Sequence, residues 1–261
     1  MRLARPISLR WLIVALPVAS LAVGVVNSQA ATKTKLSGTI TVDAASSLTH
    51  AFTQIAAKFH KLYPQTRVIF NFGSSTTLAN QIIAGAPTDL FASADLTDMD
   101  STVSAGFVHV APKIFVRNTL EIAVKPGNPL HITGLSSLPS AGVIALCSAT
   151  APCGIYAANA LRRAGVTLSS SNIDRQANST STVLQVAYGD VGAAVVYVTD
   201  VNSQGSLVSA VRIPATQNVI ADYPIAPLAE SQNPRLAAAF LKFVTSKDGQ
   251  RSLRAAGFLA P

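Results

Sequence analysis

The segment TVDAASSLTHAFTQIAAKFHKLYPQTRVIFNFGSS, residues 41–75, decides the fold. A β-rich run over 38–45 leads into it, and a second β-rich run follows at 67–72. Between them, apolar residues recur at helical spacing and mark one face of a helix. These residues are Leu48, Phe52, Ile55, Phe59 and Leu62. Strand-like and helix-like segments that alternate in this way predict a mixed α/β architecture.

The same alternation continues along the chain. Further β-rich runs lie at 88–94, 142–147 and 193–200, and helix-like segments lie at 74–85, 155–164 and 180–188. Asp95 resembles a helix cap, with Asp98 in the capping-box position. Residues 233–258 have the pattern of two amphipathic helices separated near Asp248 and Gly249.

Two long extended segments indicate that the chain forms two lobes. Residues 113–129 are β-rich and end in a Pro/Gly turn, and residues 219–228 can carry the chain back. We therefore expect two lobes joined by two crossing strands, with the first lobe at 31–117 and 221–261 and the second at 118–220.

The first thirty residues have the pattern of an export signal. Arg2, Arg5 and Arg10 precede an apolar run over 11–26, and small residues at 28 and 30 predict cleavage after Ala30. An N-terminal membrane anchor is the alternative, since the apolar run is near the lower limit of spanning length. Pro17 inside the run favours removal.

The charge of the chain does not point to nucleic acid. The full sequence carries a net charge of +8, and removal of the signal leaves 17 basic and 12 acidic residues. These charges are dispersed, with no basic run and no interleaved aromatic residues, so we do not expect nucleic-acid binding. No G-x-S-x-G or HExxH pattern is present, so we do not expect an enzyme.

Cys147 and Cys153 are the two cysteines of the chain. They lie six residues apart, and in an oxidising compartment such a pair predicts a small disulfide loop. Two free buried thiols are the alternative.

Small hydroxyl or glycine-containing clusters stand at four positions where a helix is about to start. They are Ala45-Ser46-Ser47, Gly73-Ser74-Ser75-Thr76, Pro152-Cys153-Gly154 and Asn178-Ser179-Thr180. A helix start exposes unpaired N–H groups and a partial positive charge. Each cluster alone is far more often a cap than a ligand contact. Several of them around one point would bind an anion without Lys or Arg.

Four stretches resemble one family. TVDAASSLTHAFTQIAAKF (41–59), FGSSTTLANQIIAGAPTDLFASAD (72–95), PCGIYAANAL (152–161) and VYVTDV (196–201) are similar to the periplasmic molybdate-binding proteins of ABC importers. The resemblance extends from Gly38 to Phe258. It implies a type II periplasmic binding protein fold, with a ligand cleft between two lobes, and a monomer in the periplasm that captures molybdate or tungstate and delivers it to an importer permease. No cofactor is implied beyond that ligand.

The resemblance also implies the ligand residues. The two serines of the first lobe fall on Ser47 and Ser75, the two backbone amides of the second lobe on Cys153 and Ser179, and the tyrosine hydroxyl on Tyr197. These groups would hold the metal of the oxyanion through its oxygens.

Three positions depart from the family pattern. Asp43 replaces an apolar aromatic residue, and because an acid would oppose a dianion we expect it to point away. Cys153 stands where a small residue is usual, and only its amide is needed. Ser179 replaces a branched apolar residue and adds a hydroxyl donor.

The choice of anion has an alternative. Molybdate, tungstate and sulfate are dianions that only accept hydrogen bonds, whereas a phosphate site usually includes a carboxylate. A receptor for sulfate, phosphate or another small anion on the same fold remains the alternative function.

Asp89, Asp95, Asp98 and Asp100 form the densest acidic patch. It can meet basic residues on a permease, or it can serve helix capping on a solvated face.

Overall fold

The computed structural model describes Leu3 and residues 36–261. The predicted export signal and its cleavage point therefore lie outside the described residues, apart from Leu3. No helix among the described residues is long and apolar enough to cross a membrane. The strands are β1 (Gly38–Ala45), β2 (Thr66–Gly73), β3 (Leu90–Ala92), β4 (Lys113–Val124), β5 (Ile144–Cys147), β6 (Ile173–Gln176), β7 (Ala193–Tyr197), β8 (Ser209–Arg212) and β9 (Ile220–Pro227).

Eight α-helices accompany these strands in residues 36–261. They are α1 (Thr49–Leu62), α2 (Ser75–Ile83), α3 (Leu96–Ser104), α4 (Pro152–Arg163), α5 (Ser179–Tyr188), α6 (Val198–Gln204), α7 (Pro234–Val244) and α8 (Lys247–Ala256). The 3₁₀ turns are η1 (Ser46–Leu48), η2 (Leu135–Ser140), η3 (Ser170–Asn172) and η4 (Gly205–Leu207). The mixed α/β architecture predicted from the alternating patterns is confirmed.

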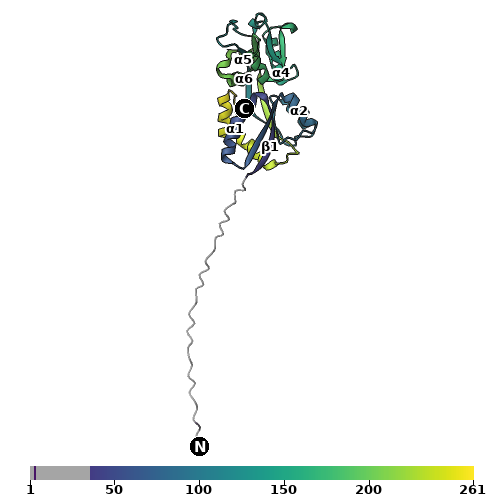
Figure 1. Ribbon diagram of the computed structural model, residues 1–261. Helices are drawn as coiled ribbons and strands as arrows, with labels where there is room; N and C mark the ends of the chain where they lie inside the picture. The colour runs from purple at the N-terminus through teal and green to yellow at the C-terminus, as the bar shows by residue number, and fades with distance from the viewer. Residues whose placement is uncertain (1–2, 4–35) are drawn as a thin grey trace. The chain divides into compact units, whose positions relative to one another are not determined.

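The strands pair in the order β2-β1-β3-β9-β4-β7-β5-β6, and β8 pairs with β4. The first group, β1, β2 and β3, is parallel, and β9 is antiparallel to β3. In the second group, β5 is parallel to β6 and β7. Figure 1 shows α1, α2 and β1 in one half of residues 36–261 and α4 and α5 in the other.

Strand β4 belongs to both groups of strands. Its residues 113–119 pair with β9, whereas residues 120–124 pair with β7 and β8. At the changeover the side chain of Asn218, just before β9, accepts from the Leu120 amide at 3.0 Å and donates to the Leu120 carbonyl at 2.8 Å. Strands β4 and β9 thus carry the chain out of one half and back, as expected. The predicted boundaries at residues 117 and 220 remain predictions.

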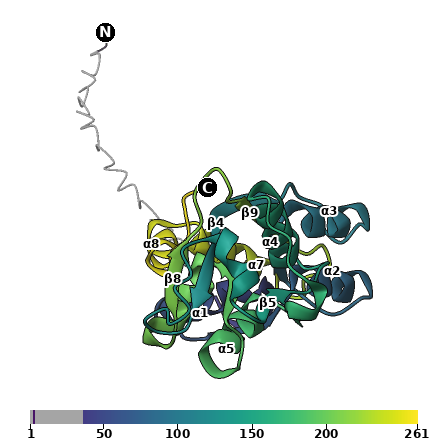
Figure 2. The ribbon, with the colours of Figure 1, turned by 90° about the horizontal axis from the view of Figure 1, so that it is seen from above.

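The packing of the first half follows the alternation of its strands. On β3, Leu90 and Ala92 face the large core that contains Phe52 and Phe240, and Phe91 faces a smaller core with α2 and α3. Phe52 and Phe240 are in edge-to-face contact, with ring centroids 6.3 Å apart. Figure 2 shows α2 and α3 next to each other.

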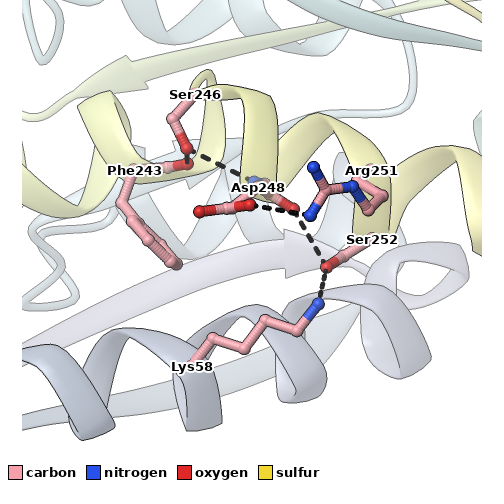
Figure 3. Close-up of polar contacts among 7 residues, drawn as sticks. Lys58, Phe243, Ser246, Asp248, Arg251 and Ser252 are labelled. Carbon is pink, nitrogen blue, oxygen red and sulfur yellow. Dashed lines mark hydrogen bonds and ion pairs between the residues drawn. The ribbon is translucent and has the colours of Figure 1, made fainter.

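The C-terminal helices divide earlier than the sequence pattern indicates. The break lies at Thr245 and Ser246, because the Ser246 hydroxyl oxygen accepts from the Gly249 amide and caps α8. Asp248 and Gly249 therefore lie inside its first turn. Lys58 of α1 donates to Ser252 of α8 at 2.7 Å and ties the two helices together (Figure 3).

Two further expectations differ from the structure. Leu62, placed on the buried face of its helix, is 60% exposed because it is the last residue of α1. The run 193–200 is a strand only as far as Tyr197, and Val198 begins α6, whose Asp200 side chain accepts from the Tyr197 amide.

Candidate functional site

A small cavity lies where the helix starts meet. The space between its lining atoms, open solvent included, is about 200 Å³. All five residues predicted to bind the anion line it: Ser47, Ser75, Cys153, Ser179 and Tyr197. The other lining residues are Ala45, Ser46, Gly73, Ser74, Ala94, Ala151, Pro152 and Asn178.

The strand order brings these residues together. Strands β1 and β2 end at Ala45 and Gly73, and β5, β6 and β7 end shortly before or at the other lining segments. Carboxyl ends of parallel strands share one edge of a sheet, and ligand crevices form outside that edge. Two such edges, one from each half, therefore contribute the walls of the cavity.

Helix starts supply neutral donors to the cavity. The N-cap residue of α2, Ser74, makes no side-chain cap bond, so the first N–H groups of α2 stay available. In α4, Pro152 has no N–H and the Gly154 amide donates to the Ala151 carbonyl at 2.9 Å, which leaves the Cys153 amide as the available donor. Helix α5 adds a third start at Ser179. No Lys, Arg, His, Asp or Glu is among the described residues that line the cavity. Positive potential at this point comes from backbone dipoles.

Hydrogen bonds from behind orient the lining hydroxyls of the first half. The Ser75 oxygen accepts from the Ala94 amide at 2.9 Å, which leaves its hydrogen free to be donated. The Ser47 oxygen lies 2.8 Å from the Tyr223 hydroxyl, and Asn118 donates to that same Tyr223 oxygen at 3.4 Å. When Tyr223 donates to Ser47, the Ser47 hydrogen also becomes available to a ligand.

Tyr197 carries a polar group with no partner. Its side chain is 1% exposed, and its hydroxyl makes no hydrogen bond within residues 36–261. Burial raises the pKa of Tyr197 well above its ordinary value, so the hydroxyl stays neutral and able to donate. A buried donor without an acceptor costs on the order of 1–3 kcal/mol, and an anion in the cavity would remove that cost.

Ser179 differs from expectation. Its hydroxyl was expected as an extra donor to the ligand, but it donates to Asp200 Oδ1 at 3.0 Å. Asp200 is 2% exposed, and burial raises its pKa to about 7, while bonds from Ser179 and from the Tyr197 amide lower it. The expectation of an extra hydroxyl donor is wrong, because a carboxylate takes that hydrogen.

Asp43 lies outside the cavity lining, as expected. It stands on β1 between Asn71 of β2 and Phe91 of β3, on the strand face opposite Val42 and Ala44. Burial raises its pKa, and contacts with the Thr88 and Asn71 side chains lower it.

A disulfide joins Cys147, the last residue of β5, to Cys153 in the first turn of α4. The next residue, Gly154, must lack a side chain, because a Cβ there would lie 2.0 Å from the Ser148 carbonyl oxygen. Any other residue would force this turn to open. The bond and the glycine together fix the Cys153 amide beside the cavity.

Three of the four acidic residues in the patch are buried. Asp89 accepts from the Thr41 amide, and Asp95 caps α3 by accepting from the Asp98 amide. Asp98 accepts from Thr76 at 3.0 Å. These contacts favour helix capping and internal bonding as the role of the patch over a permease contact. The patch is not a solvated face, because Asp100 is its one exposed residue.

Sequence reasoning missed the supporting residues Asn118, Asp200 and Tyr223. Asp200 lies three residues after Tyr197, which is a local signal of a helix-start contact. Tyr223 lies 176 residues from Ser47, so nothing local in the sequence could have paired them.

Comparison with known proteins agrees with this geometry. Residues 40–259 match the family described as bacterial extracellular solute-binding protein. The chain belongs to this family. It is 36% identical over 223 residues to the molybdate-binding protein ModA of Mycobacterium tuberculosis, and the match covers 85% of both chains.

Solved structures of solute-binding proteins share the fold. The Azotobacter vinelandii periplasmic molybdate-binding protein superposes with a TM-score of 0.76 at 20% identity, covering 85% of this chain and 99% of the other. The sulfate-binding protein SubI of M. tuberculosis gives 0.75 at 20% identity, covering 84% and 86%. The predicted two-lobed periplasmic binding protein fold is confirmed. Because a molybdate-binding and a sulfate-binding protein superpose on this chain almost equally well, the fold alone does not determine which anion is bound.

The disulfide leads to a test of thiol content. We expect the denatured protein to take up no thiol reagent without reductant and two equivalents after reduction, measured by mass. A Cys147→Ser variant provides the control, with one reactive thiol in both conditions. Two labelled thiols in the unreduced wild type would contradict the disulfide.

Asp98 leads to a pH prediction. Burial and the charge of Asp95 raise the Asp98 pKa from 3.8 to about 7. Between these values the unfolded chain has released a proton that the folded protein keeps, so stability falls as pH rises from about 4 to about 7. Asp98→Asn keeps an acceptor for Thr76 and removes this titration. Its melting temperature should therefore fall less between pH 5 and pH 8 than that of the wild type.

The matched control is Asp100→Asn, which removes an exposed carboxylate two residues further along α3. It should retain the wild-type pH dependence. Equal pH dependence in the wild type and Asp98→Asn would refute the assignment.

Proposed function

We propose that this chain captures a tetrahedral oxyanion, molybdate or tungstate, and delivers it to an ABC importer. The observation that carries the proposal is the Tyr197 hydroxyl, a buried donor without a partner in the described residues, in a cavity that three helix starts also line. A ligand that only accepts hydrogen bonds satisfies all of these groups at once.

The donor set follows from the geometry. Ser47, Ser75 and Tyr197 give hydroxyls, and Cys153 and Ser179 give amides. Two of the five come from the first half and three from the second, so a bound anion draws the two halves together. This is the arrangement that a hinge-closing receptor needs.

The chemistry of the lining favours a fully ionised dianion. Hydrogen phosphate carries a proton that needs an acceptor, and no carboxylate is among the described lining residues. Asp200 lies behind Ser179 and is occupied by two donors. A receptor for sulfate is the second candidate, because sulfate is also a dianion and a sulfate-binding protein shares the fold. The 36% identity to a molybdate-binding relative favours molybdate.

The cavity supports binding rather than catalysis. General acid–base or nucleophilic chemistry requires a titratable group beside the reacting atom. The described lining offers hydroxyls and amides, with no histidine or carboxylate as base. We infer a receptor that needs no cofactor beyond its ligand, exported to the periplasm after cleavage near Ala30, and acting as a monomer beside its permease.

Calorimetric titration tests the proposal. The protein without residues 1–30 is titrated with molybdate, tungstate, sulfate and phosphate. We expect binding of molybdate and tungstate, with sulfate much weaker and phosphate absent. Sulfate binding at least as tight as molybdate binding would support the second candidate, and no response to any anion would refute oxyanion capture.

Loss of single donors tests the placement of the site. Ser75→Ala and Tyr197→Phe each remove one hydroxyl and leave a ligand oxygen unpaired, which should weaken molybdate binding by roughly 1–3 kcal/mol. Tyr188→Phe is the control, because Tyr188 is 72% exposed and does not line the cavity. Unchanged affinity in both site variants would show that the anion binds elsewhere.

A further inference from the structure

Ser46 and Ser179 meet across the two halves of the protein. Ser46 begins η1, directly after β1, and Ser179 begins α5, which packs on β5 and β7. Their hydroxyl oxygens are 3.0 Å apart in a buried position, although 133 residues separate them in the sequence. A direct side-chain bond therefore links the halves at the wall of the cavity.

The direction of this bond is fixed by Asp200. The Ser179 hydroxyl donates to Asp200 Oδ1 at 3.0 Å, which is the direction that an ionised carboxylate requires above the Asp200 pKa of about 7. The Ser179 oxygen then accepts the hydrogen of Ser46. Bonds to a carboxylate are roughly twice as strong as neutral ones, and Asp200 is held in place by the Tyr197 amide on its other oxygen at 3.2 Å.

The start of α5 also holds Ser46 through Thr180. The Thr180 amide donates to the Ser46 hydroxyl oxygen at 3.4 Å, and the Thr180 hydroxyl donates to the Ser46 carbonyl at 3.1 Å. The Asn178 side-chain oxygen accepts a hydrogen bond from the Ser181 amide at 3.0 Å. In this turn, the Ser179 amide is thus left to face the cavity while its neighbours hold the turn in place.

A second link lies on another side of the cavity. The Thr76 hydroxyl of α2 lies 2.9 Å from the Thr150 carbonyl oxygen, just before α4, and shares its one hydrogen between that oxygen and Asp98. Links from the first half therefore reach the starts of both α4 and α5. Both links contact a buried carboxylate, Asp200 at Ser179 and Asp98 at Thr76, but only the link through Ser46 joins two residues that line the cavity.

We propose that Ser46, Ser179 and Asp200 form a latch that holds the two halves closed, with the Ser179 hydroxyl acting in closure while its amide serves the ligand. The latch rests on the contacts between the halves, and its effect on anion affinity rests on the proposed function. Ser46 and Asp200 are positioning residues in this arrangement, and Ser179 has both roles.

A double-mutant cycle tests the latch. Ser46→Ala, Ser179→Ala and the double variant are compared for molybdate affinity, molybdate release rate and the free energy of unfolding without ligand. Each single variant should weaken binding about 5-fold, the effect of one hydrogen bond, mainly through faster release. The double variant should bind less than about 25-fold more weakly than the wild type, because both changes remove the shared Ser46–Ser179 bond. It can be weaker than either single variant, since Ser46→Ala also removes the acceptor of the Thr180 amide and Ser179→Ala also removes the donor to Asp200.

Two independent donors would give a different result. If the Ser179 hydroxyl instead served the anion and Ser46 acted separately, the double variant would be about 25-fold weaker. Ser203→Ala is the matched control: its exposed hydroxyl donates within α6 to the Asp200 carbonyl, and it should bind as the wild type does.

The ligand-free measurement separates the latch from the proposed function. Non-additive unfolding energies, or non-additive affinities, support the latch, and additivity in both overturns it. A wild type that binds none of the four anions refutes the proposed function alone. The latch is then decided by the unfolding cycle, where additivity overturns it.

Discussion

Unpaired N–H groups at helix starts are the constraint on which the candidate site depends. The first N–H groups of an α-helix have no acceptor inside the helix, and burial of such donors without partners is costly. In this chain α2, α4 and α5 start at one small cavity, and the N-cap residues of α2 and α4 make no side-chain cap bond. The structure therefore concentrates neutral donors at one place, which an anion can satisfy and an apolar ligand cannot.

Around this cavity, polar groups are divided between two tasks. Ser75 and Tyr197 have hydrogens available to the cavity, whereas the Ser179 hydroxyl is committed to Asp200. The Ser46–Ser179 bond joins the halves without using a donor of Ser75 or Tyr197, so the proposed latch and the proposed ligand contacts use different hydrogens. Asp200 contacts both groups of residues, since it accepts from the Ser179 hydroxyl and from the backbone of Tyr197.

The family and the solved structures place this arrangement in a wider group. Solute-binding proteins with TM-scores of 0.76 and 0.75 to this chain are named for molybdate and for sulfate. A shared fold thus accommodates different anions, and selectivity must come from the size of the cavity and the direction of its donors. Both depend on the side chains and backbone amides at the helix starts rather than on the strand order.

The sequence by itself determined the elements and the five lining residues. Period-two and helical patterns located β1, α1 and β2, because burial of one face imposes that spacing. The family resemblance selected Ser47, Ser75, Cys153, Ser179 and Tyr197, and all five line one cavity. Boundaries set by a single cap bond were missed, as at Ser246, since a capping hydroxyl and an ordinary serine look alike in sequence.

Only the tertiary structure decided which way each polar group points. The Ser179 hydroxyl is an extra donor by the sequence pattern, yet Asp200 takes its hydrogen, and Tyr223 lies against Ser47 from 176 residues away. Hydrogen-bond direction depends on which groups meet in space, and contacts between distant strands leave no local pattern. The sequence therefore determined which residues surround the cavity, and the fold determined which of their atoms are free to bind.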